Sequence, residues 1–111
     1  MEINIRDLGK HKILAVQGDV DLYNVGELKQ AIFKLLDTDD VKSLIIDMNG
    51  ISYMDSSGIG ALVAGQKKVK TKAGKFALLN IRDEVLNILK LATLDQFFTI
   101  YEGESDIPDV D

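Results

Sequence analysis

At the centre of this chain of 111 residues stands Tyr53-Met54-Asp55-Ser56-Ser57-Gly58-Ile59-Gly60. The apolar run 43–48 before it is typical of a buried strand, and the apolar residues 61–64 after it indicate the start of a buried helix. The first amides of a helix lack backbone partners and carry the positive end of the helix dipole. A serine there can cap the helix, and a phosphate there would be well placed. The stretch therefore predicts a strand-to-helix junction at which Ser56 either only caps the helix or also acts as a switch.

Outward from this junction, strand and helix patterns alternate along the chain. The predicted order is β-β-α-β-α-β-α-β, with strands over 2–7, 11–18, 42–48, 75–79 and 97–101 and helices over 25–36, 57–72 and 84–91. This order is typical of an α/β fold, and the chain length fits a single domain. We expect a mostly parallel mixed sheet of about five strands with the helices packed on it.

Three local features add detail to this outline. Asn24 and Glu27 have the spacing of a capping box, and Gly74 is a candidate left-handed stop for the second helix. The second helix also contains Gly58, Gly60 and Gly65, and each glycine costs about 1 kcal/mol relative to alanine. Packing rather than propensity must hold this helix, with glycine allowing its backbone to approach either the sheet or a partner closely.

Polar side chains follow two of the predicted strands. Asp19 and Asp21 leave the second strand, whereas Asp55, Ser56 and Ser57 follow the third. Strands joined by a helix are normally parallel, so their carboxyl ends share the edge of the sheet where ligands and partners usually dock. We therefore expect Asp21 and Ser56 to be neighbours. Each residue alone is more often a cap or a loop residue, but their convergence favours a functional site.

Composition narrows the class of partner. The 18 acidic and 13 basic residues give a net charge of −5, but residues 102–111 hold five of the acids and no base, so the remainder is about neutral. A neutral domain predicts no nucleic-acid partner. We expect the acidic tail to be a frayed, solvated end, with an interaction segment as the alternative.

The sequence also bears on the cellular compartment of the protein. The start of the chain lacks the pattern of a signal peptide, and no run approaches the ~18 apolar residues of a membrane span. The absence of cysteine suits a reducing compartment. These features predict a cytoplasmic protein without a membrane partner.

Enzymatic and cofactor-dependent functions find little support. The only histidine, His11, begins the second strand, so a serine nucleophile at the far edge would have no base within reach, and no catalytic residue is predicted. A phosphoaspartate receiver would need a lysine after the last strand, where Glu102 and Glu104 stand instead. The aspartates do not predict a metal site because Asp47 lies within a strand, and Gly58-x-Gly60 is too short for a nucleotide loop. No cofactor is expected.

Motifs along almost the whole chain, about residues 3–101, resemble those of a known family. Tyr53-Met54-Asp55-Ser56-Ser57-Gly58-Ile59-Gly60 resembles the signature of STAS domains, in particular the bacterial anti-sigma factor antagonists. Val16-Gln17-Gly18-Asp19-Val20-Asp21 is similar to the family's segment after the second strand, Leu44-Ile45-Ile46-Asp47-Met48 to its central strand, and 85–98 to its closing helix and strand. The resemblance implies a STAS-like domain over residues 1–101, followed by an acidic tail over 102–111.

The resemblance also implies a mechanism. An unphosphorylated antagonist binds an anti-sigma factor, which is also a serine kinase, and so frees the sigma factor. Phosphorylation of the serine after the motif aspartate, Ser56 here, ends binding, and a metal-dependent serine phosphatase restores it. The partner-binding residues implied are Asp21, Asp55, Ser56, Ser57 and Gly58. Two alternatives remain open: a scaffold or transporter-associated STAS module without a phosphorylation cycle, and a small-molecule domain that binds phosphate at the glycine-rich helix start.

Overall fold

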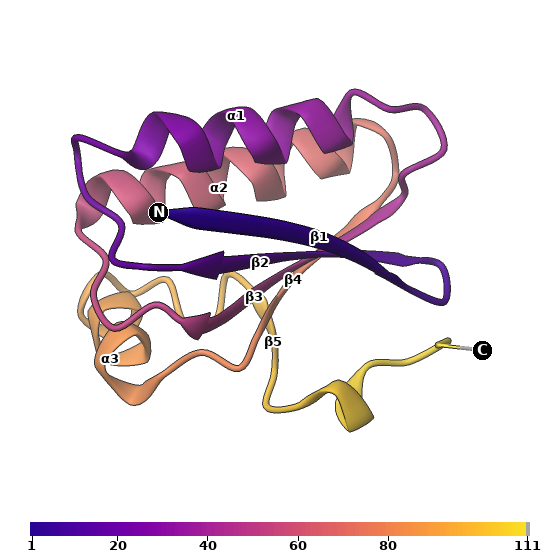
Figure 1. Cartoon of the computed structure of the whole chain (residues 1–111). Helices are drawn as coiled ribbons and strands as arrows, with labels where there is room; N and C mark the ends of the chain where they lie inside the picture. Colours follow the sequence, from indigo (N-terminus) through magenta and orange to yellow (C-terminus); the bar gives the residue numbers. More distant parts are fainter. Residues whose placement is uncertain (111) are drawn as a thin grey trace.

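The predicted order of strands and helices is confirmed by the structure, a computed structural model that describes residues 1–110 (Figure 1). The elements are β1 (Glu2–Leu8), β2 (His11–Gln17), α1 (Val25–Leu36), β3 (Ser43–Gly50), α2 (Ser56–Thr71), β4 (Lys75–Leu79), α3 (Asp83–Leu91) and β5 (Thr99–Tyr101), followed by a short 3₁₀ helix, η1 (Glu104–Asp106). β3 runs two residues further than predicted and takes in Asn49 and Gly50, whereas β5 begins two residues later than predicted.

The sheet has five strands in the order β1-β2-β3-β4-β5. β1 pairs with β2 in the antiparallel sense, and all other neighbours are parallel. The expectation of a mostly parallel mixed sheet is therefore confirmed. Helices α1 and α2 lie side by side on one face of the sheet, and α3 lies near the edge at which β3 and β4 end (Figure 1).

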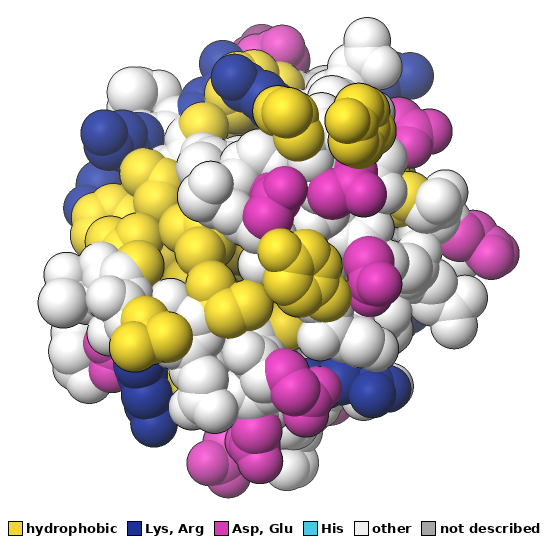
Figure 2. Space-filling model, turned by 90° about the vertical axis from the view of Figure 1, so that its left-hand side faces the viewer, with side chains coloured by type: hydrophobic (Ala, Val, Ile, Leu, Met, Phe, Trp, Pro, Cys, Tyr) yellow, Lys and Arg dark blue, Asp and Glu magenta, His cyan; other side chains and the backbone are white. Residues whose placement is uncertain are grey.

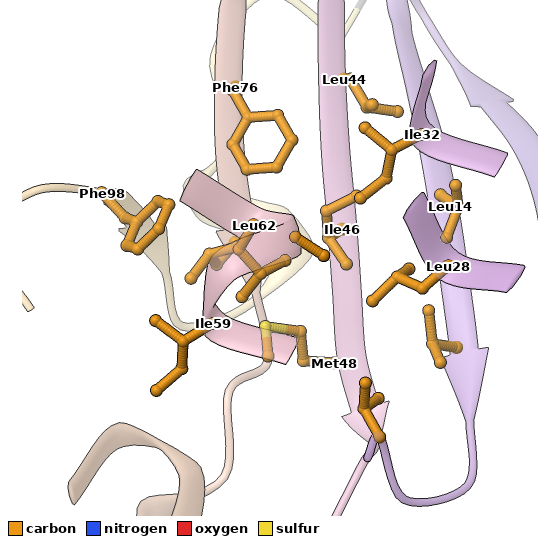
Figure 3. Close-up of a cluster of buried hydrophobic side chains, with 14 of the residues drawn as sticks. Leu14, Leu28, Ile32, Leu44, Ile46, Met48, Ile59, Leu62, Phe76 and Phe98 are labelled. Carbon is orange, nitrogen blue, oxygen red and sulfur yellow. The ribbon is translucent and has the colours of Figure 1, made fainter. Parts of the chain in front are cut away.

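The main core fills the space between the sheet and the two long helices. Alternate residues of β2 and β3, such as Leu14 and Ile46, point toward α1 and α2, whose Ile32 and Leu62 are fully buried against them (Figure 3). Gly65 brings α2 close to this layer, since a Cβ at that position would lie 2.8 Å from a ring carbon of Phe76. Packing on the sheet thus holds a helix that its own composition would not.

The opposite face of the sheet is covered by the end of the chain. Ile107 is 5% exposed and packs with Ile13 and Leu79, among other residues of this face. His11 Nε2 donates a hydrogen bond to the carbonyl of Pro108 at 2.7 Å, and Glu104 pairs with Arg6. We call residues 102–110 the C-terminal strap. The expectation of a frayed end is wrong for this strap, because Ile107 is buried on the face of the sheet that α1 and α2 do not cover. Its separation from a domain of residues 1–101 remains a prediction.

The end of α2 also differs from the prediction. Ala73, with φ of 53°, occupies the left-handed position expected for Gly74, and the Gly74 amide donates to the Val69 carbonyl at 2.9 Å. Gly74 serves instead as a site of close approach, because a Cβ there would lie 2.7 Å from the Lys42 carbonyl oxygen.

Candidate functional site

The loops that follow β2 and β3 run together as a short parallel bridge. Val20 pairs with Met54: the Val20 amide donates to the Tyr53 carbonyl at 3.0 Å, and the Asp55 amide donates to the Val20 carbonyl at 3.1 Å. The predicted meeting of the two segments is therefore confirmed. Figure 2 shows this edge of the molecule, where α1 and α2 begin and where acidic and hydrophobic side chains lie close together. We call this surface the rim, defined by residues 19–23 and 53–57.

Asp55 holds the two halves of the rim together. Its Oδ1 accepts hydrogen bonds from the amides of Ser57 at 2.9 Å and Gly58 at 3.3 Å, which makes Asp55 the N-cap of α2. Its Oδ2 accepts from the amide of Leu22 at 3.1 Å, across the bridge. One carboxylate thus caps a helix and fixes the loop that leads to the other helix.

These donors favour the ionised form of Asp55. The pKa of the carboxyl is lowered from its ordinary value of 3.8, chiefly by the hydrogen bond from the Ser57 hydroxyl. The amides of Gly58, Ser57 and Leu22 act in the same direction, while partial burial opposes them. Asp55 is therefore a fixed negative charge at neutral pH.

The two serines of the motif have different surroundings. Ser57 is half-buried, and its hydroxyl donates to Asp55. Ser56 is the first residue of α2 and is exposed, and within residues 1–110 its hydroxyl makes no hydrogen bond. The interpretation of Ser56 as the helix cap is wrong, because Asp55 already accepts the amides that a cap would bind. The Ser56 hydroxyl is left facing solvent.

Asp21 organises the start of α1. Its Oδ1 accepts from the amides of Tyr23 at 2.9 Å and Asn24 at 3.1 Å, and its carbonyl accepts from the Val25 amide at 2.9 Å. The predicted capping box of Asn24 and Glu27 is wrong, since the Asn24 side chain turns back to accept from the Asp21 amide. Asp21 thus sets the shape of the loop that Asp55 anchors.

Gly58 is buried beneath the rim. A Cβ there would lie 2.4 Å from Cγ of Met54 and 3.0 Å from Cγ1 of Val20, so only glycine lets α2 begin against the bridge. The structure thus gives Gly58 a packing role. A contact between Gly58 and a partner stays a prediction, as it does for the other four residues assigned to partner binding.

Three large apolar side chains on the rim were not predicted as site residues. Leu22 is 70% exposed, Tyr23 is 95% exposed and Tyr53 is 51% exposed. The sequence carries a signal for the first two, because they follow Asp21 directly and precede the apolar stripe of α1. The rim therefore combines free apolar surface with the carboxylates of Asp21 and Asp55.

Other chemistry lies away from the rim. His11 stands at the opposite, amino end of β2, where its Nδ1 is 2.6 Å from Oγ of Ser43. No group of three or more His, Cys, Asp or Glu residues among 1–110 could hold a metal ion. In the same part of the chain, no helix combines the length and apolar character needed to cross a membrane.

A family model and curated relatives match the chain over most of its length. The STAS domain family matches residues 2–107. The chain is 25% identical over 105 residues to the anti-sigma-B factor antagonist of Staphylococcus aureus strain NCTC 8325 / PS 47, covering 93% of this chain and 96% of the relative.

Solved structures share the fold. The crystal structure of an anti-sigma factor antagonist from Mycobacterium paratuberculosis matches with a TM-score of 0.84 at 23% identity, over 95% of this chain and 88% of that one. A part of the murine Slc26a9 anion transporter matches with a TM-score of 0.77 at 23% identity, over 91% of this chain and 17% of the transporter.

Proposed function

This chain belongs to the STAS domain family, and we propose that it is an anti-sigma factor antagonist regulated by phosphorylation of Ser56. In its unphosphorylated form it binds an anti-sigma factor that is also a serine kinase, and binding releases the sigma factor. A metal-dependent serine phosphatase reverses the phosphorylation. The protein works in the cytoplasm as a binding module and not as an enzyme. The full-length relationship to the Staphylococcus aureus antagonist supports this role.

The observation that carries the proposal is the free hydroxyl of Ser56. It is exposed and unbonded within residues 1–110, whereas the neighbouring Ser57 hydroxyl is half-buried and bound to Asp55. A kinase needs an accessible hydroxyl as its acceptor. Of the two serines in the motif, Ser56 alone meets this requirement.

The surroundings of Ser56 also suit a switch. A phosphoserine adds ~1.5–2 negative charges at neutral pH. The Ser57 and Gly58 amides are already bound by Asp55, so they do not draw the phosphate inward. The new charge would remain on the surface near Asp55 and Asp21, and the domain itself would change little. A docked partner would meet the whole charge.

The charge of a phosphate can supply the free-energy change that such a switch requires. Moving a binding equilibrium from nearly complete to nearly absent requires about 5 kcal/mol. Burying a phosphate that has no paired cation in a desolvated interface costs several kcal/mol. A phosphate on Ser56 that the partner leaves unpaired is thus sufficient, without any refolding of the antagonist.

The test is phosphorylation by the cognate kinase. The chain is incubated with each purified anti-sigma factor kinase of its organism and ATP, and the modified residue is mapped by mass spectrometry. We expect phosphate on Ser56, none on Ser56→Ala, and normal labelling of Ser57→Ala. Phosphate on Ser56→Ala, at any other residue, would reject the assignment.

A second variant tests the charge mechanism. Ser56→Asp is expected to melt within about 2 °C of the wild type, because the substituted side chain lies on the surface, and to lose measurable binding to the anti-sigma factor. Tight binding by Ser56→Asp would show that charge on the rim does not control docking.

A transporter-associated or scaffold role is the second candidate, favoured by the fold shared with part of Slc26a9. Such a module would copurify with a membrane complex or large assembly and would remain unphosphorylated. A phosphate-binding pocket at the helix start is disfavoured, because Asp55 occupies the amides that such a ligand needs. Calorimetry with nucleotides would show heat only if that pocket existed.

A further inference from the structure

Three large apolar side chains are exposed on the rim, on the two chain segments that the Val20–Met54 bridge joins. The Leu22 amide is fixed to Asp55, Tyr23 follows it, and Tyr53 pairs through its carbonyl with the Val20 amide. Exposed apolar side chains that gather at one site are typical of an interaction surface, and the bridge brings the segments of these three to the same edge of the molecule. We call Leu22, Tyr23 and Tyr53 the apolar knob.

The glycines of the two long helices supply an independent observation. Gly58 and Gly65 are required by packing inside the molecule. Gly60 in α2 and Gly26 in α1 are exposed, and a Cβ added at either position would meet nothing within 4 Å. Glycine weakens a helix relative to alanine, so nothing within the described molecule accounts for these two.

Both of these glycines lie next to the rim. Gly60 is one helical turn beyond Ser56 and therefore shares its face of α2. Gly26 and Tyr23 line the same open groove along α1, which continues past Phe33 to Asp37 and is lined by both basic and acidic side chains, Lys29, Lys34, Glu27 and Asp37. No side chain therefore covers the helix backbone at these two positions, as a closely approaching partner backbone would need.

Charge indicates the chemistry of the partner. Asp19, Asp21 and Asp55 flank the knob, and none of them forms an ion pair within residues 1–110. Complementary potentials favour a basic counterpart. A lipid or nucleic-acid surface would instead repel these carboxylates.

We infer that the anti-sigma factor seats the apolar knob in an apolar recess ringed by basic side chains, while its backbone lies against Gly60 and Gly26. This inference rests on the proposed function and identifies the residues that would supply its binding energy. Leu22, Tyr23 and Tyr53 anchor the partner, the two glycines admit it, and Ser56 belongs to the same rim, one helical turn before Gly60. A phosphate on Ser56 would then enter the apolar part of the contact, where it would lose water without gaining a basic partner.

The experiment measures the dissociation constant of the unphosphorylated chain for the anti-sigma factor kinase that labels Ser56. Tyr23→Ala and Leu22→Ser are expected to raise it by about tenfold or more, as is usual for interface anchors. Leu91→Ser, which removes an 86% exposed leucine from α3, is the matched control and should stay within about twofold.

Variants of the exposed glycine in α2 distinguish an effect on partner binding from an effect on stability. Gly60→Gln should weaken binding about tenfold or more while raising the melting temperature by roughly 2–4 °C, because glutamine is the better helix former. Gly103→Gln is its control, since a Cβ at Gly103 also meets nothing within 4 Å, and it should bind like the wild type.

Each outcome decides a separate point. If no anti-sigma factor binds the wild type, the proposed function is wrong and this inference falls with it. If the wild type binds but Tyr23→Ala and Gly60→Gln bind within about twofold of it, the inference is overturned and the proposed function stands. The inference is also overturned if Leu91→Ser weakens binding as much as Tyr23→Ala does.

Discussion

At the scale of single residues, Asp55 controls the geometry of the rim. Its two oxygens accept amides from both segments of the bridge, and it also accepts the Ser57 hydroxyl. Serine and aspartate are almost equally good caps, so the sequence alone could locate the junction at residues 55–57 without showing which side chain caps it. The structure gives the cap to Asp55 and leaves Ser56 free. That division of labour is what makes a modification at Ser56 compatible with an intact helix start.

The ionised Asp55 carboxylate should make stability dependent on pH. Asp55→Asn keeps a capping side chain but loses the charge, and we expect it to unfold at lower urea concentration than the wild type at pH 7. The wild-type pKa is depressed in the folded state, so the advantage is complete above the ordinary value of 3.8 and declines as pH falls through the native pKa. Urea titrations between pH 7 and pH 2.5 measure the difference.

A matched variant controls for general charge effects. Asp40→Asn removes an exposed carboxylate from the loop between α1 and β3, and its difference from the wild type should be small at every pH. An Asp55→Asn difference that persists undiminished at the lowest pH would contradict the role assigned to the ionised carboxylate.

At the scale of elements, α2 shows how packing outweighs propensity. Its glycines divide by position, since Gly58 and Gly65 face the bridge and the sheet, whereas Gly60 faces solvent. The helix end is set by a similar need for close approach, with Gly74 against Lys42. The helix is therefore defined by what lies beneath it.

This division gives a paired prediction. Gly65→Ala should lower the free energy of unfolding by about 1–3 kcal/mol, because the methyl group would press against Phe76 and Ile32. Gly60→Ala should raise it by about 0.5–1 kcal/mol, because it adds helix propensity without a clash. Urea denaturation of both variants measures the two effects. Equal changes of one sign would contradict the packing assignment.

The elements also show how far the sequence alone could predict the structure. Apolar periodicity located the helices α1, α2 and α3 and all five strands, since burial dictates that pattern, and the parallel order brought the two loops together. The predictions of helix caps and chain ends failed where several local conformations have similar energy. Asn24 could cap α1 in isolation, but its side chain instead accepts the Asp21 amide, in a loop that Asp55 holds through the Leu22 amide. The knob was missed because periodicity describes what is buried, not what is left exposed.

At the scale of the whole molecule, the two faces of the sheet are covered in different ways. Two helices cover one face, and the C-terminal strap covers part of the other. The five acidic residues of the tail predicted that it is solvated, and the single isoleucine, Ile107, did not change that prediction. The sequence could not show that Ile107 faces Ile13 and Leu79, since that contact depends on the complete sheet.

The strap should contribute measurably to stability. Ile107→Ala is expected to lower the free energy of unfolding by about 2 kcal/mol or more, as for other buried isoleucines. Val110→Ala, at a residue 38% exposed, should change it by less than about 0.5 kcal/mol. Thermal unfolding followed by circular dichroism measures both. If Ile107→Ala is as mild as Val110→Ala, the strap does not bind the sheet in solution.

The contact between the strap and β2 gives the molecule its own spectroscopic reporter. His11 is the only histidine in the chain, and the acceptor for its Nε2 is a carbonyl, so this nitrogen must carry the proton while the strap is docked. The imidazole resonance of His11 does not overlap with that of any other histidine, so an NMR spectrum will show whether the strap has detached from β2. Fusion of a tag to the strap or cleavage by a protease could be followed in this way.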